Sequence, residues 1–104
     1  MDRKQQQLQD SIAEIKAELT ALGRLRPGSL SKQARARGSS YFQITCTHKG
    51  RTRCEYVRAD YEPVIREEIQ TYRRYRDLTR QWVAMELELS RLRQNQAAGR
   101  QGCP

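Results

Sequence analysis

The chain has 104 residues, of which 37% are hydrophobic and 31% charged, and its formal net charge is +8. A chain of this length normally forms one domain, and this composition leaves only a thin core that oligomerisation would stabilise. Because the sequence has no long apolar run and residues 1–9 are too polar for a signal peptide, we expect a cytoplasmic protein without a membrane partner.

The first predicted element is a helix over residues 3–23. Apolar residues recur there at alternating spacings of four and three, which places them on one helical face. Gly23 followed by Pro27 is typical of a helix end. The residues of this face are Leu8, Ile12, Ile15, Leu19 and Leu22.

Residues 24–40 predict a basic loop. The segment contains the turn-forming run Pro27-Gly28-Ser29 and has little apolar material beyond Leu25 and Leu30. A short helical turn over residues 30–36 is left open as an alternative.

Residues 41–58 change to an alternating pattern that predicts a β-hairpin, in which Gly50 can adopt a positive φ. An odd loop would put Phe42, Ile44 and Cys46 on one face with Cys54 and Tyr56. An even loop would put them with Arg53, Glu55 and Val57 instead. The first arrangement buries more apolar surface, so we predict a loop of three or five residues.

A second, longer helix is predicted over residues 61–95, with Asp60 as its N-cap and Pro63 in its first turn. Residues 97–104 lack periodicity and predict a disordered tail. At roughly 1.5 Å per residue this helix would span about 50 Å, against about 30 Å for the first. The apolar stripe of the long helix comprises Ile65, Ile69, Tyr72, Tyr75, Leu78, Trp82, Met85, Leu89 and Leu92.

These elements predict a mostly helical α+β domain over residues 1–96, in the order helix, basic loop, hairpin and long helix. We expect the two helices to form an antiparallel helical hairpin or coiled coil that leaves part of the longer stripe uncovered. Dimerisation would cover this part, although simple fraying of the helix end is the alternative. The residues predicted to form a homodimer interface are Leu78, Trp82, Met85, Leu89 and Leu92.

Positive charge is concentrated in the middle of the chain. Residues 32–58 hold seven basic residues and one acidic residue, so six of the eight net charges lie there. Arginine and lysine interleaved with aromatic residues favour contacts with phosphate backbones, and a two-stranded ribbon fits a major groove. The predicted nucleic-acid-binding residues are Lys32, Arg35, Arg37, Lys49, Arg51, Arg53, Arg58 and Arg74.

Two interpretations of this charge are open beside a merely solvated surface. In the first, the chain is a small accessory protein that binds nucleic acid, with DNA expected over RNA. In the second, it is a coiled-coil assembly or adaptor protein whose positive surface meets an acidic protein partner.

Metal binding and catalysis have weaker signals. Cys46 and His48 with Cys54 offer three zinc-type ligands, and Cys103 would make a fourth, but the spacing is unlike that of paired zinc ligands. We interpret Cys46 and Cys54 as small core residues and expect no metal or other cofactor. One histidine, without a phosphate loop or nucleophile elbow, gives no set of catalytic groups, so we expect no enzyme activity.

Five short segments carry a resemblance to a known family: Leu-Arg-Pro-Gly-Ser-Leu at 25–30, Tyr-Phe-Gln-Ile at 41–44, Lys-Gly-Arg-Thr-Arg at 49–53, Tyr-Val at 56–57 and Ile-Gln-Thr-Tyr-Arg-Arg-Tyr-Arg-Asp-Leu at 69–78. Together they resemble a family of small uncharacterised bacterial proteins, often encoded near transposases and other mobile-element genes. The resemblance implies a bacterial or phage setting and a partner protein encoded nearby. Members often carry a cysteine-rich segment before the first strand, whereas this chain has Ala-Arg-Ala-Arg-Gly at 34–38, so no metal role is implied.

Overall fold

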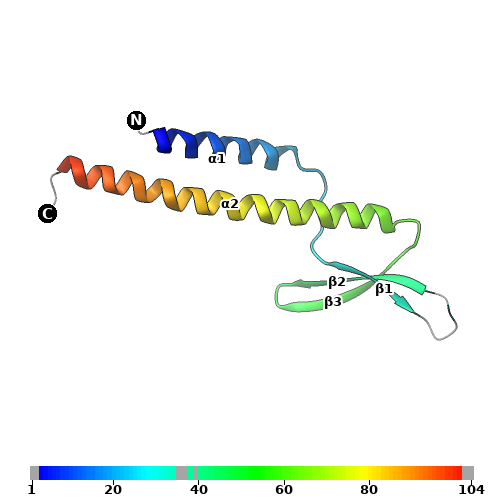
Figure 1. Ribbon diagram of the computed structural model, residues 1–104. Helices are drawn as coiled ribbons and strands as arrows, with labels where there is room; N and C mark the ends of the chain where they lie inside the picture. Colours follow the sequence, from blue (N-terminus) through cyan, green and yellow to red (C-terminus); the bar gives the residue numbers. More distant parts are fainter. Residues whose placement is uncertain (1–2, 35–37, 39, 102–104) are drawn as a thin grey trace. The chain divides into compact units, whose positions relative to one another are not determined.

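The computed structural model describes residues 3–34, 38 and 40–101 of the chain (Figure 1). Within these residues the fold is α+β, with two helices and one three-stranded antiparallel sheet. The elements in chain order are α1 (Arg3–Ala21), β1 (Ser29–Ala34), β2 (Ser40–His48), β3 (Arg51–Val57) and α2 (Glu62–Gln101).

The chain divides into two compact units. One unit contains α1 and the part of α2 from Tyr75 onward, and the other comprises Leu22–Arg74. The long helix therefore contributes to both units. It also continues to Gln101, beyond its predicted end at Asn95, so the predicted tail is helical over residues 97–101.

In the first unit, α1 and the second half of α2 lie side by side and antiparallel (Figure 1). Near the start of α1, Lys4 Nζ lies 2.8 Å from Glu88 Oε1. Later in α1, Lys16 Nζ lies 5.2 Å from the ring centroid of Trp82, a residue that comes earlier in α2 than Glu88, as an antiparallel arrangement requires. Part of the apolar face of each helix is buried in this pair, and the rest of each face is partly exposed. The buried hydrophobic side chains are Ile12, Ile15, Leu78 and Leu89.

In the second unit, the sheet has the order β1-β2-β3, and one of its faces is partly covered by the first turns of α2. Apolar side chains from β2, β3 and α2 meet there, because alternate strand residues point to the same side. The buried cluster is Ile44, Val57, Ile65 and Ile69, with Leu30 and Phe42 packed against it.

The prediction of a loop over residues 24–40 is wrong for Ser29–Ala34, which form β1. This strand pairs with β2, with Leu30 opposite Ile44 and Lys32 opposite Phe42. The chain before it is attached to α2, because the Arg26 backbone N–H donates to the Glu68 carbonyl at 3.1 Å.

The prediction of an odd hairpin loop is also wrong. Lys49 and Gly50 alone connect β2 to β3, and both have positive φ, at 53° and 77°. Two successive residues of this conformation form the tight turn whose twist matches that of paired strands. The register therefore places Glu55 opposite Ile44 and Arg53 opposite Cys46, on the side that the odd loop would have kept apolar.

Gly28 gives a testable consequence of the close packing before β1. Its φ is +145°, and an added Cβ would lie 2.9 Å from Ile44 Cγ1 and 3.0 Å from the Thr45 carbonyl oxygen. We expect Gly28→Ala to lower the free energy of unfolding by about 2 kcal/mol or more, because it adds both backbone strain and overlap with a core residue. Urea unfolding followed by circular dichroism would measure this loss.

Gly23→Ala is the matched control for that experiment. A Cβ at Gly23 would meet nothing within 4 Å. We expect this variant to stay within about 1 kcal/mol of the wild type, since alanine restricts only the unfolded chain there. Equal losses in the two variants would contradict the packing described for Gly28.

Candidate nucleic-acid interface

The hairpin register gives the sheet two chemically different faces. On the face toward α2, Ile44 of β2 lies opposite Glu55, Cys46 opposite Arg53 and His48 opposite Arg51. The opposite face carries only uncharged side chains from the paired residues of the three strands. These residues are Ser29, Ser31, Gln33, Tyr41, Gln43, Thr45, Thr47, Thr52, Cys54 and Tyr56.

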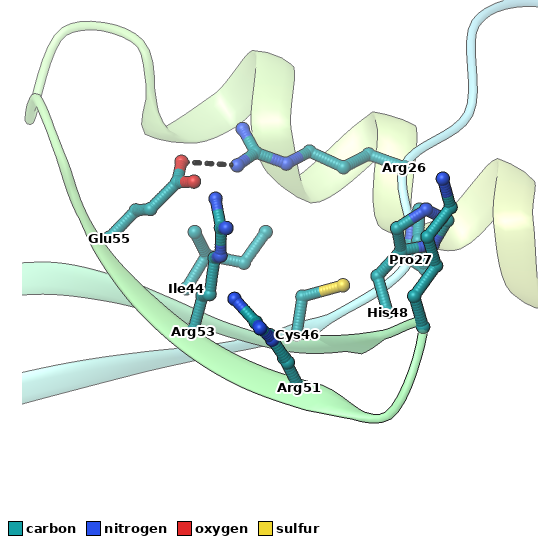
Figure 2. A pocket seen from close by; sticks show the side chains of 9 residues that line it. Arg26, Pro27, Ile44, Cys46, His48, Arg51, Arg53 and Glu55 are labelled. Atoms are coloured by element: carbon teal, nitrogen blue, oxygen red, sulfur yellow. Dashed lines mark hydrogen bonds and ion pairs between the residues drawn. The ribbon is translucent and has the colours of Figure 1, made fainter.

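The α2-facing side is covered only near Val57 and Ile44, so its other end borders an open hollow of about 520 Å³. We call this space the basic hollow. Figure 2 shows Arg51 and Arg53 rising from β3 on the same side as Cys46 and Ile44. Among the described residues, the lining of the basic hollow is Arg26, Pro27, Ile44, Cys46, His48, Lys49, Arg51, Arg53 and Glu55.

Positive charge dominates the basic hollow. Two guanidinium groups come from β3, one from the segment before β1 and an ammonium group from the hairpin turn. Of the described residues in the lining, Glu55 alone carries a carboxylate. Arg26 Nη2 reaches across to Glu55 Oε2 at 2.7 Å (Figure 2). This ion pair leaves Arg51, Arg53 and Lys49 as positive charges that no carboxylate of the lining offsets.

Both the backbone and the side chain of Arg26 form hydrogen bonds. Its backbone N–H is bonded to α2 and its guanidinium to β3, so its position is better defined than that of an unattached surface arginine. Its side chain is about one third exposed and remains accessible to a ligand in the basic hollow. The sequence offered only a weak signal for this role, namely a basic residue directly before Pro27 and Gly28.

Three of the predicted nucleic-acid-binding residues, Lys49, Arg51 and Arg53, come together in the basic hollow. Lys32 lies on β1 outside its lining, and Arg74 lies on an exposed position of α2. The other predicted residues, Arg35 and Arg37, lie outside the described residues. The site gains Arg26, His48 and Glu55, which were not predicted to belong to it.

Arg58 lies on another part of the surface, where its Nη2 pairs with Asp60 Oδ2 at 2.8 Å. Asp60 therefore binds a neighbouring side chain and is not the predicted N-cap of α2. The carbonyl of Tyr61 accepts the first helical N–H, from Ile65, at 3.1 Å.

The register also bears on the zinc alternative. Cys46 and His48 lie on the face of the basic hollow, whereas Cys54 lies on the opposite face, with its Sγ 3.5 Å from Thr45 Oγ1. Cys103 lies outside the described residues. Among the residues that the structure describes, no group of three histidine, cysteine or acidic side chains is placed to hold a metal ion.

The residues predicted for dimerisation divide into two groups. Leu78 and Leu89 are buried in the chain's own helical pair, while Trp82, Met85 and Leu92 are partly buried. The more accessible apolar side chains of this unit are Val83 and Leu87, which are 59% and 53% exposed. Together with Trp82 they form an open surface that we call the helical apolar patch.

No helix in the described part of the chain is both long and apolar enough to cross a membrane. Comparisons of the chain with protein-family models, with curated proteins and with solved structures found no match. The chemistry of the basic hollow is therefore the main basis for a functional proposal.

Proposed function

We propose that the protein is a small nucleic-acid-binding accessory protein that holds a phosphate backbone in the basic hollow. The observation that carries this proposal is the grouping of Arg26, Lys49, Arg51 and Arg53 around one space in which the carboxylate of Glu55 is already paired. Guanidinium groups form charge-assisted, forked hydrogen bonds with phosphate oxygens, which suits this lining to a polyanion. DNA is the ligand that we expect, and the setting in a mobile element or phage rests on the family resemblance of residues 25–30, 41–44, 49–53, 56–57 and 69–78.

The position of the arginines favours one mode of contact over another. A ribbon lying in the major groove would present the face away from α2, and that face carries only uncharged residues. A backbone passing through the basic hollow would instead meet Arg51 and Arg53 directly. This second mode replaces the groove insertion that the hairpin alone had indicated.

The direct test is titration of fluorescently labelled single-stranded and duplex DNA and RNA at two salt concentrations. Binding to phosphates releases counterions, so the affinity should be micromolar or tighter at low salt and fall steeply as salt is added. The proposal fails if no oligonucleotide binds at low salt.

Glu55→Gln should raise the affinity for an oligonucleotide. The substitution removes the negative charge of Glu55 from the basic hollow, while the glutamine side-chain oxygen can still accept a hydrogen bond from Arg26. At a separation of several ångströms in a partly hydrated site, one unit charge changes the affinity by about two- to five-fold. Fluorescence anisotropy at low salt would detect this gain, and an unchanged or weaker affinity would show that Glu55 does not face the bound phosphate.

A second candidate function is that of an assembly or adaptor protein, and the helical apolar patch favours it. Val83 and Leu87 are exposed on α2, and a second copy of the chain would cover them in a homodimer. Light scattering would show twice the chain mass for the wild type and a shift toward the monomer for Val83→Ser with Leu87→Ser. A monomeric wild type would exclude the dimer.

A further inference from the structure

A second hollow lies at the other end of β3, in the same compact unit as the basic hollow. Its volume is about 370 Å³, and Arg26 belongs to the lining of both spaces. We call it the tyrosine hollow after Tyr61, which lines it and is 47% exposed. Tyr56 borders the hollow at the edge of β3, but its ring lies on the other face of the sheet, with its centroid 6.2 Å from that of Tyr41. Tyr61 therefore supplies an accessible aromatic side chain at this hollow.

The lining of the tyrosine hollow suits a flat, uncharged ring better than an anion. Val57 and Ile65 contribute apolar surface and are themselves buried in the core, so they form a rigid base. The charges nearby are balanced, since Arg58 is paired with Asp60. An aromatic ring bound there would gain stacking and apolar contact without meeting an uncompensated charge.

The two hollows are suitably arranged for neighbouring parts of one ligand. Strand β3 runs from Arg53 in the basic hollow to Val57 in the tyrosine hollow, about 13 Å apart at the usual rise per residue. Arg26 stands at the boundary, bonded to Glu55 between them. A nucleic-acid strand carries phosphates and aromatic rings at such a spacing, within the length of a dinucleotide.

We propose that the tyrosine hollow binds one unpaired nucleobase of a strand whose phosphates occupy the basic hollow. This inference rests on the proposed nucleic-acid binding and adds its specificity. A base in a duplex is stacked on both faces and paired along its edge, so it cannot enter without first being unpaired. The protein should therefore select single-stranded over duplex nucleic acid, and base stacking on tyrosine accommodates different sequences.

The experiment compares four ligands of equal length by fluorescence anisotropy: a single-stranded DNA, the RNA of the same sequence, the DNA duplex, and a single-stranded DNA in which every base is replaced by an abasic site. We expect the base-bearing strands to bind at least about 10-fold more tightly than the abasic strand, whose phosphates are the same. The duplex should bind no better than the abasic strand. Different affinities of the DNA and RNA strands would identify which of the two sugars the site prefers.

Variants of Tyr61 separate stacking from folding. We expect Tyr61→Ala to weaken binding of the base-bearing strand about 5- to 100-fold and to leave binding of the abasic strand unchanged. Tyr61→Phe keeps the aromatic face and should retain the wild-type affinity. Circular dichroism of each variant would verify that the sheet is formed.

The outcomes distinguish this inference from the proposal on which it rests. If the abasic and base-bearing strands bind equally and Tyr61→Ala weakens neither, the tyrosine hollow is not a base site, although phosphate binding stands. If none of the four ligands binds at low salt, nucleic-acid binding itself is refuted, and the inference falls with it.

Discussion

Reversal of two charges, in the variant Arg51→Glu with Arg53→Glu, is expected to lower the affinity for a single-stranded oligonucleotide at least about 100-fold at low salt. Each arginine would lose a charge-assisted hydrogen bond of roughly 1.5 kcal/mol, and two such losses amount to about a 100-fold change before any repulsion is counted. Both residues are exposed and lie opposite His48 and Cys46, so the change removes no buried packing. The fold and any self-association through α2 should be unaffected.

The matched control is Arg91→Glu with Arg93→Glu, which changes the net charge equally at exposed positions of α2 in the other compact unit. If the basic hollow is the site, this control keeps most of the affinity, because only long-range attraction is reduced. The dependence of log affinity on log salt concentration adds a second readout, since its slope for a single strand becomes shallower by about 0.7 for each phosphate that the variant no longer binds. Equal losses in both variants would mean that general charge, and not the basic hollow, attracts the ligand.

The same pair of variants separates the two candidate functions. An assembly protein that uses the helical apolar patch would keep its mass in solution in both variants and would show no nucleic-acid binding in the wild type. A nucleic-acid-binding protein would lose binding in the first variant alone. The two functions therefore predict opposite patterns in one set of proteins.

The helices were the most predictable part of this fold, because a helical stripe is a local property of the sequence. Spacings of three and four residues from Leu8 to Leu22 and from Ile65 to Leu92 identified both elements without knowledge of their partners. The partner of each stripe was harder to predict. Leu78 and Leu89, which we expected at a dimer interface, are buried in the antiparallel pair with α1.

Strand β1 was missed because its own residues barely favour a strand. Ser29–Ala34 contains a single large apolar residue, Leu30, and no alternation. Its strand conformation comes from pairing with β2, which is a tertiary interaction between residues that are distant in the sequence. Local propensity gives little warning of such a strand.

The hairpin register differs from the prediction for another reason, and the difference decides which side chains line the candidate site. The odd loop would be favoured if another element covered the whole of one face of the hairpin, because that register places the most apolar residues on one face. In the structure α2 covers only the end at Ile44 and Val57, so arginines are tolerated at the open end of the same face. The turn chemistry of Lys49 and Gly50 was the better guide, because two residues with positive φ define a two-residue loop.

Ile44→Ala is expected to produce the largest loss of stability, about 2–5 kcal/mol in the free energy of unfolding. Ile44 is 1% exposed and belongs to a buried cluster of only four described residues, so little neighbouring apolar material can fill the space left by its side chain. Since small domains are stable by only about 5–15 kcal/mol, this change would remove a large fraction of the total. Urea unfolding measured by circular dichroism would give the value.

Ile44→Val is the control, because it removes one methylene group and should cost about 0.5–1.5 kcal/mol. Hydrogen exchange would locate the effect: amides of β2 and β3 should exchange faster in Ile44→Ala, whereas those of α1 should change less, because α1 belongs to the other compact unit. Equal acceleration in both units would show that they unfold together.

Ile44 also lines the basic hollow, so Ile44→Ala should weaken oligonucleotide binding, while Ile44→Val retains it. If Ile44→Ala lowered the free energy of unfolding by less than about 1 kcal/mol, a core centred on Ile44 would be contradicted. The packing that supports β3 and its arginines beside the basic hollow would then also be in question.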